Sequence, residues 1–467
     1  MKDDSLDRNT IKSCLTVLER LQEHKHYLPE ESHALRQLQN HLRRLDACLD
    51  IDGSDSLEKD LDDSAKSILE SFRERPRQSP LLTSSSTLER SIMLGNSSSL
   101  PFPNLNSAGT NNAELSQLMS QFESLENFDV FKLAKLTEDR PLEAVTLTLL
   151  HRYNLCDKLS LPVNKVASYL QVVEDSYKDN NPYHNATHAA DVVQALAWLL
   201  SGDSFTRQLT DLELLCIIIA AAVHDVGHPG VRNDFLVNLG TDAAVRYNDN
   251  SVNENGHAAM AFELLYNPKH NFVAHLRADE RHFFRRTVCD IILGTDMSQH
   301  DNHLKNFKGK VQEYGTNIGQ WPLEARDVLL QYLMHAADIS NPLRPSALSS
   351  SWSKRIMEEF MLQGDRERAM GMPVSPLCDR ETTDWKKSQL VFLECVVRPV
   401  FESLVPLAPN GASHALSSIE FSRSSWQSGS LSRPSSELSL PNDSPAQPSV
   451  IMDKVPSSSI FALEDVH

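Results

Sequence analysis

Apolar helical segments that end in histidine or aspartate constrain this chain more than any other feature of its sequence. The apolar run 217–223 leads directly into His224 and Asp225, and the apolar segment 329–337 leads into Asp338. A carboxylate at the buried end of a helix costs several kcal/mol unless hydrogen bonds or a cation compensate its charge. We therefore expect helices to bring these side chains to one site that holds a cation.

Helical periodicity extends over the whole central part of the chain. No stretch there shows the sustained alternation of apolar and polar residues, closed by hairpin turns, that is typical of a β-sheet. The predicted helices include residues 142–153, 163–177, 211–223, 254–265, 281–293, 324–337, 351–362 and 385–404. The sequence thus predicts an all-α fold, built as a compact multi-helix bundle.

Residues 1–50 are predicted to form a separate helical segment. Leucines recur there at alternating spacings of three and four residues, the a/d pattern of a coiled coil, at Leu35, Leu38, Leu42, Leu45 and Leu49. The pattern lasts about two heptads, fewer than the three or four that indicate a coiled coil firmly. Packing of this helix on the rest of the chain and formation of a homodimer through it are alternative hypotheses.

Two further regions lack a periodic apolar face. Residues 51–113 are rich in acidic residues and serine, and residues 406–467 are rich in serine and proline. Such segments bury too little apolar surface to offset the entropy lost on ordering. We expect a disordered linker at 51–113, a disordered tail at 406–467, and one folded domain between them at 114–405.

The charge and the cysteine content of the chain indicate which binding partners and which cellular compartment to expect. The chain has 467 residues and a formal net charge of −18, which argues against a nucleic-acid-binding surface. Its seven cysteines are scattered without a CxxC pair, as expected of reduced thiols in the cytoplasm. We find no signal peptide and no apolar run long enough for a transmembrane segment.

Histidine and aspartate recur at helical spacing near residue 188. His184 and His188 are four residues apart, so they share one face of a helix. Asp191 follows His188 by three residues and can orient its imidazole ring, as carboxylates often do for metal-bound histidines. One histidine on a helix is usually structural, but two on one face, with a second His–Asp pair downstream, indicate a metal site.

These segments together supply a metal-ligand set of two histidines and two aspartates. Mixed nitrogen and oxygen ligation suits zinc in a catalytic site that keeps positions for water. Asp225 has two carboxylate oxygens and can bridge to a second, harder ion such as magnesium. A pair of metal ions favours in-line displacement at phosphorus, so we expect a metal-dependent hydrolase.

Short strings over about residues 120–405 resemble the catalytic domain of the class I 3′,5′-cyclic nucleotide phosphodiesterases, within the wider His-Asp hydrolases. Several of the strings are most similar to the cyclic-AMP-specific branches. The matching strings are residues 183–185, 188–192, 224–231, 247–249, 254–255, 295–297, 338–342, 355–360, 363–365, 375–379 and 388–389.

The resemblance implies hydrolysis of 3′,5′-cyclic nucleotides to 5′-monophosphates, which ends second-messenger signals, with cyclic AMP preferred over cyclic GMP. By position, His188, His224, Asp225 and Asp338 match the residues that hold zinc in this family. Asp225 also matches the bridge to the second ion, magnesium or manganese.

The resemblance also implies roles around the substrate. His184 matches the general acid that protonates the departing O3′ oxygen, and Glu254 matches the carboxylate that orients this histidine. The residues that match substrate-binding positions are Tyr183, Asn341, Ile356, the purine-reading Gln389 and the base-stacking Phe392. A glutamine amide both donates and accepts hydrogen bonds, so it suits adenine or guanine according to its orientation.

Four positions depart from the usual pattern of the family. Gly227 stands where an acidic residue is usual, Gly256 where histidine is usual, and Asn253 where leucine is usual. Ser349 lies where cyclic-AMP-specific relatives often carry a tyrosine. None of the four is a predicted metal ligand, but loss of a carboxylate beside the ligands typically lowers affinity or activity by about 10–100-fold.

Two alternatives to a cyclic nucleotide phosphodiesterase follow from the sequence. Gly227 and Gly256 motivate a catalytically weakened relative that binds cyclic nucleotide or a regulatory partner without efficient turnover. A different His-Asp phosphohydrolase acting on nucleotides is the other alternative. Gln389 with Phe392 and the string 338–342 argue against that second alternative.

Overall fold

The computed structural model describes residues 65–66, 68–70, 110–202 and 204–428. The predicted helical segment 1–50 with its leucine seam, most of the predicted linker, and the tail from residue 429 lie outside these residues. Within them the secondary structure is helical and contains no strand, so the prediction of an all-α fold is confirmed. No helix among these residues has the length and apolar content that crossing a bilayer requires.

The helices that build the bundle are α5 Thr110–Met119, α6 Val130–Leu136, α7 Pro141–Arg152, α9 Val163–Ser176, α10 Ala186–Ser201, α11 Asp211–Val223, α14 Val252–Tyr266, α15 Ala278–Leu293, α16 His300–Tyr314, α17 Leu323–Asp338, α18 Ser346–Ala369, α19 Trp385–Val391, α20 Arg398–Leu404 and α21 Pro409–Ser428. Short helices connect them: α8 Leu155–Lys158, η1 Ser204–Gln208, α12 Asn233–Asn238, α13 Asp242–Arg246, η2 Met297–Gln299, η3 Ile318–Gln320 and η4 Asn341–Leu343. A π-helical turn, η5 Phe392–Val397, joins α19 to α20.

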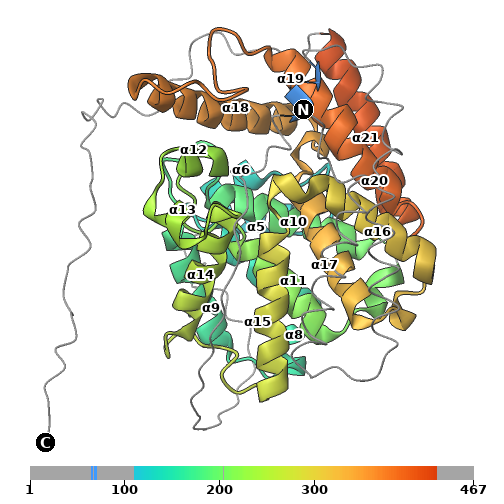
Figure 1. The fold of residues 1–467 in the computed structure, drawn as a ribbon. Coiled ribbons are helices and arrows are strands. Elements are labelled where there is room, and N and C mark those ends of the chain that lie inside the picture. The colour runs from blue at the N-terminus through green and yellow to red at the C-terminus, as the bar shows by residue number, and fades with distance from the viewer. Residues whose placement is uncertain (1–64, 67, 71–109, 203, 429–467) are drawn as a thin grey trace, which may run out of the picture.

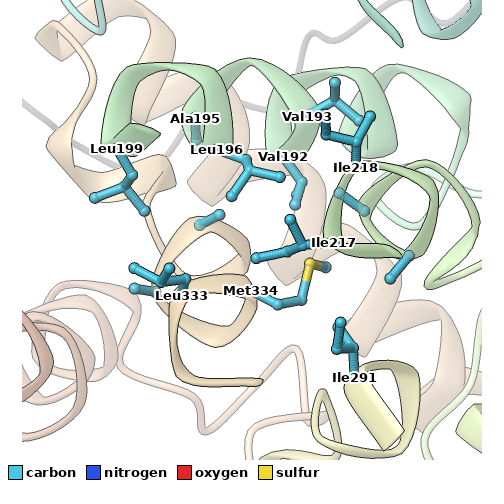
Figure 2. Packing of buried hydrophobic residues seen from close by; sticks show 14 of the residues in the cluster. Val192, Val193, Ala195, Leu196, Leu199, Ile217, Ile218, Ile291, Leu333 and Met334 are labelled. Carbon is cyan, nitrogen blue, oxygen red and sulfur yellow. The ribbon is translucent and has the colours of Figure 1, made fainter. Parts of the chain in front are cut away.

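Helix α11 lies in the middle of the bundle, between α10, α15 and α17 (Figure 1). Every residue of α11 from Glu213 to Val223 is buried, as expected of a helix that is apolar on all sides. Figure 2 shows the core that α11 shares with its neighbours: Val192 and Leu196 of α10, Ile217 of α11, Ile291 of α15, and Leu333 and Met334 of α17. Burial of each such side chain contributes about 1.5–3 kcal/mol.

A capping box starts α11 and also ties it to α17. The Thr210 hydroxyl accepts from the Glu213 backbone N–H at 3.2 Å, and the Glu213 carboxylate accepts from the Thr210 backbone N–H at 2.7 Å. The same carboxylate accepts from Arg326 of α17, with Nε 2.6 Å from Oε1. Because α11 and α17 lead into Asp225 and Asp338, this contact helps to fix the helices that carry both aspartates.

The prediction of disorder from residue 406 is wrong for the first part of that segment. Helix α21 packs on α20 and on η4, and its Ala415, Ile419 and Trp426 are buried. Its buried residues recur at spacings of three and four, an amphipathic face that the serine-rich composition concealed. Inside the predicted linker, residues 65–66 and 68–70 are helical, and Ala65, Ile68 and Leu69 are buried.

Candidate active site

Three helices bring two histidines and two aspartates together at one point. Asn185 caps α10 by accepting from the Thr187 and His188 backbone N–H groups at 3.0 and 3.3 Å, which places His188 in the first turn of that helix. His224 and Asp225 follow the last residue of α11, and Asp338 is the last residue of α17. We call these four residues, His188, His224, Asp225 and Asp338, the His-Asp cluster.

The ligand atoms of the His-Asp cluster face one another at short range. His188 Nε2 lies 3.1 Å from Asp338 Oδ1 and 3.5 Å from Asp225 Oδ2. His224 Nε2 lies 3.1 Å from Asp225 Oδ2 and 3.4 Å from Asp338 Oδ1. Ligand atoms about 2.0–2.1 Å from a tetrahedral metal ion are roughly 3.3 Å apart, so these separations suit a metal ion. His188, His224 and Asp225 present ligand atoms that all lie within 4.8 Å of one another, and Asp338 contacts both histidines.

The hydrogen bonding of His224 supports the same interpretation. Its Nδ1 lies 3.0 Å from the Ala221 carbonyl oxygen, which can only accept, so Nδ1 carries the proton. When the ring is neutral, as metal binding requires, Nε2 holds the lone pair, and this atom is buried with no hydrogen bond. A buried lone pair aimed at two carboxylates needs a cation, and the donor set fits a divalent metal ion.

The charges of the cluster attract positive charge to it. Burial alone would lower the pKa of His224, but the Asp225 and Asp338 carboxylates raise it well above its usual range. Burial would raise the pKa of Asp225, but neighbouring His224 and His184 hold it well below its usual range. The same field stabilises a bound cation at this point.

A second cluster next to the first is joined by hydrogen bonds. His184 Nδ1 bonds to the Glu359 carboxylate, which also accepts from the Tyr183 and His184 backbone N–H groups at 2.9 and 3.1 Å. The His228 ring stacks on His184 with centroids 4.0 Å apart, and its Nδ1 accepts from the Gly230 N–H at 3.0 Å. These hydrogen bonds occupy Nδ1 of His184, Nδ1 of His228 and the Glu359 carboxylate. The cluster therefore suits proton transfer better than metal binding.

Glu359 keeps His184 protonated near neutral pH. Burial lowers the pKa of His184, but the charges of Glu359 and Asp225 outweigh burial and raise it to about 9. In turn, burial raises the pKa of Glu359, but His184 outweighs burial and lowers it to about 2. The pair is therefore an imidazolium and a carboxylate at pH 7, which is the state that a general acid requires.

The carboxylate expected to orient His184 was Glu254, and the structure places Glu254 elsewhere. Its carboxylate accepts from Asn233 Nδ2 at 2.9 Å, while Glu359 occupies the position against His184. Burial, with the nearby charge of Asp296, raises the pKa of Glu254 to about 8. Glu359 had no local signal, because it lies 175 residues from His184 in the sequence.

Asp191 likewise has partners other than the one predicted. It makes no hydrogen bond to His188, whose Nδ1 is buried without a partner. Its carboxylate instead accepts from Asn341 Nδ2 at 2.7 Å and lies 2.9 Å from Arg344 Nη2. Asn341 in turn accepts from the Tyr183 hydroxyl, so Asp191 positions two of the predicted substrate-binding residues.

One pocket of about 250 Å³ is lined by Asp225 and Asp338 of the His-Asp cluster, by His184 and His228 of the second cluster, and by the predicted base-binding residues. Tyr183, Asn341, Ile356, Gln389 and Phe392 all line it, as do His184, Asp225, Glu254 and Asp338. The Ser353 hydroxyl, also in its wall, donates to Gln389 Oε1 at 2.8 Å. The ligand atoms and a flat apolar and amide surface thus share one cavity.

The two glycines that depart from the family pattern have different surroundings. Gly227 has a φ of +75°, and a Cβ there would lie 2.7 Å from the Sδ and Cε atoms of Met260. Met260 thus occupies space beside Gly227 that a larger residue would need. Gly256 lies inside α14, and a Cβ there would meet no atom within 4 Å.

Comparison with known proteins agrees with this geometry. Residues 183–418 match the protein-family model described as 3′5′-cyclic nucleotide phosphodiesterase, which is just over half of the chain. The chain is 39% identical to the 3′,5′-cyclic-AMP phosphodiesterase 4C of Rattus norvegicus over 71% of this chain and 63% of that protein. It is 38% identical to the probable 3′,5′-cyclic-AMP phosphodiesterase pde-4 of Caenorhabditis elegans over 68% of this chain and 47% of that protein.

A relative from Drosophila melanogaster, 3′,5′-cyclic-AMP phosphodiesterase isoform F, is 37% identical over 68% of this chain and 48% of its own length. The chain therefore spans between about half and somewhat under two thirds of the curated relatives that it matches. The matched residues include the His-Asp cluster, His184, Glu359 and the pocket wall. The chain belongs to the 3′,5′-cyclic nucleotide phosphodiesterase family.

Proposed function

We propose that this chain hydrolyses 3′,5′-cyclic nucleotides to 5′-monophosphates and prefers cyclic AMP. The observation that carries the proposal is the shared pocket, in which a metal-binding geometry and a protonated histidine face the same cavity as Gln389 and Phe392. The names of the relatives, which are cyclic-AMP phosphodiesterases, support the preference for cyclic AMP. The reaction would end a second-messenger signal.

The His-Asp cluster is proposed to hold zinc, and Asp225 to bridge to a second ion, magnesium or manganese. Asp225 Oδ2 faces the cluster histidines, while its Oδ1 lies 3.7 Å from the buried, unbonded Nε2 of His257. One carboxylate is thus directed toward two separate positions, which a bridging ligand requires. When bound, divalent ions supply Lewis-acid activation of water and of the phosphoryl group.

His184 is proposed to act as the general acid. Water adds to phosphorus and releases a proton to solvent, the bond from phosphorus to O3′ breaks, and O3′ needs a proton to leave as a hydroxyl group. His184 carries that proton because Glu359 raises its pKa. Glu359, and not Glu254, is the residue proposed to orient His184.

The part of the pocket wall formed by Phe392, Ile356 and Gln389 is proposed to bind the base. Phe392 offers an aromatic face for stacking, and Ile356 adds an apolar wall. The Gln389 amide supplies one donor and one acceptor for the purine edge. Tyr183 and Asn341, joined by a hydrogen bond, also line the pocket.

The organisation of the whole protein follows as a set of proposals. The catalytic domain is proposed to run from about residue 114 through α21, because α21 completes the core. A cytoplasmic location is proposed from the scattered cysteines of the sequence. Homodimer formation through the N-terminal leucines remains a proposal, which light scattering of a Leu42→Asp variant tests through the molecular mass.

The proposed function is tested by assaying the purified full chain with cyclic AMP and cyclic GMP, with zinc and magnesium present, and with a chelator as the control. Metal-dependent release of 5′-AMP ahead of 5′-GMP is the expected result. Binding of cyclic AMP to a folded, metal-loaded protein without turnover would overturn the proposal in favour of a binding protein. Turnover that persists after complete removal of metal would overturn the role of the His-Asp cluster.

A further inference from the structure

The pocket contains a charged pair that neither metal binding nor base recognition uses. Five carboxylate residues line the pocket: Asp225, Asp234, Glu254, Asp296 and Asp338. Among the described residues of its wall, Arg232 is the only lysine or arginine. Besides the metal ions and the proposed general acid His184, an anionic ligand that enters this acidic cavity therefore meets one fixed side-chain cation.

The fold holds Arg232 firmly in the wall. Its backbone N–H donates to Oε1 of the fully buried Gln363 at 2.8 Å, and its Nη1 donates to the Pro376 carbonyl oxygen at 3.2 Å. The guanidinium carbon lies 5.9 Å from the centre of the Phe360 ring, which also lines the pocket. A guanidinium held by a carbonyl oxygen and an aromatic ring loses little entropy when an anion binds nearby.

Asp234 partly neutralises this cation. Its Oδ2 lies 3.1 Å from Arg232 Nη2, and each of the two side chains is 21% exposed. Partial burial reduces screening by salt, so the charge of each residue acts on a ligand inside the cavity. Removing the charge of Arg232 makes the electrostatic potential in the pocket more negative, and removing the charge of Asp234 makes it more positive. The two substitutions therefore control for each other.

We propose that Arg232 and Asp234 set how strongly the pocket retains anionic nucleotides, and that they act more on the product than on the substrate. The inference rests on the proposed function. A cyclic nucleotide carries one negative charge on its phosphodiester. Hydrolysis converts it into a monoester that carries between about 1.5 and 2 negative charges at pH 7. Because the interaction energy is proportional to ligand charge, a change in wall charge alters product affinity by nearly twice as many log units as substrate affinity.

The experiment uses the metal-loaded full chain and three adenine ligands that differ in charge. The quantities are the KM for cyclic AMP, the inhibition constant of 5′-AMP and the inhibition constant of neutral adenosine. For Arg232→Gln we expect the KM to rise about threefold, the 5′-AMP constant to rise about five- to ninefold, and the adenosine constant to stay unchanged. For Asp234→Asn we expect both anionic constants to fall. Added salt should reduce every shift.

Two further variants control for fold and for net charge. Arg232→Lys keeps the positive charge and should stay within about twofold of the wild type. Arg368→Gln makes the same change of charge on the surface, at a side chain that is 46% exposed and pairs with Asp379, and should shift none of the three constants.

Several results would overturn the proposal. One is an equal change in all three ligands for Arg232→Gln, since a general distortion of the pocket would produce it. Another is a change of the KM for cyclic AMP and of the 5′-AMP inhibition constant in the same direction for Asp234→Asn as for Arg232→Gln. A third is a response to Arg368→Gln as large as that to Arg232→Gln. Absence of turnover in the wild type would instead contradict the proposed function, and 5′-AMP and adenosine binding would still test the charge pair.

Discussion

At the scale of single residues, the contact between His184 and Glu359 determines whether the pocket contains an acid. An isolated imidazole is mostly neutral above pH 6.5 and cannot donate a proton efficiently at pH 8. Glu359 changes this because its buried carboxylate bonds directly to Nδ1 of His184. The Tyr183 and His184 backbone N–H groups hold the carboxylate in position, so the acid depends on local backbone geometry as well.

Replacing Glu359 by glutamine should move the alkaline limb of the pH–rate profile to lower pH. The Glu359 charge raises the pKa of His184, so its removal lowers that pKa, and the acid loses its proton at a lower pH. A fall of at least one pH unit in the upper apparent pKa of kcat/KM is expected. Glu254→Gln is the control and should leave this limb in place, because Glu254 bonds to Asn233. If the alkaline limb moved in Glu254→Gln and not in Glu359→Gln, Glu254 would be the residue that orients His184, as the sequence predicted.

Two glycine substitutions should change stability with opposite signs. Gly227→Ala places a side chain at φ +75° and within 2.7 Å of Met260, so it should destabilise the protein by about 1–2 kcal/mol or more. Gly256→Ala fills open space inside α14 and should stabilise by about 0.5–1 kcal/mol. Urea unfolding measures both changes. Equal stability of the two variants would contradict the different surroundings of these glycines.

At the scale of helices, the site forms where α10 begins and where α11 and α17 end. An N-terminal cap orients His188, and the ends of two buried helices deliver Asp225 and Asp338. Helix α18 then crosses one end of the bundle (Figure 1) and supplies Ser353 to the pocket wall and Glu359 to His184. Each helix contributes few site residues, so the site depends on how the helices pack.

Helix α21 should contribute to stability through its buried face. Ile419 is fully buried, whereas Phe421, two residues later, is 60% exposed. Ile419→Ala should therefore cost about 2–5 kcal/mol, and Phe421→Ala should change stability by less than about 0.5 kcal/mol. Thermal unfolding of the two variants measures the difference. If both variants unfolded at the wild-type temperature, α21 would not be part of the folded core.

At the scale of the whole molecule, the proposed metal ion connects segments that are far apart in the sequence. His188 and Asp338 are 150 residues apart, and their side chains lie 3.1 Å from each other. Without a cation, the two carboxylates of the cluster rely on protonated histidines for compensation. Metal binding should therefore stabilise the native state as well as supply the chemistry.

Chelation should lower the melting temperature of the wild type. Metal at about 100 times its dissociation constant stabilises a folded protein by about 2.7 kcal/mol, and this contribution disappears with the ion. Asp338→Ala removes one ligand and should show a much smaller response to chelator. Differential scanning calorimetry with and without chelator measures both. A full chelator response in Asp338→Ala would place the stabilising ion outside the His-Asp cluster.

Local spacing carried much of the information about this fold and site. The helical period predicted the central helices, because an amphipathic or wholly apolar pattern is a property of neighbouring residues. The positions of His224, Asp225 and Asp338 at helix ends could be predicted for the same reason. The prediction that His184 shares a helix face with His188 is wrong, because α10 begins at Ala186, after His184. The face of α21 was also present in the sequence, but its serine-rich composition was given more weight than the spacing of its apolar residues.

Other features depend on contacts between distant segments, and only the packed structure decides them. Glu359 meets His184 across 175 residues, and Met260 fills the space beside Gly227, because α18 and α14 are packed where the core places them. Arg232 is held in the pocket wall by contacts with Gln363 and Pro376, which lie more than 130 residues away in the sequence. Sequence periodicity specifies which face of a helix is buried, but the partner that this face meets depends on the packing of the whole core.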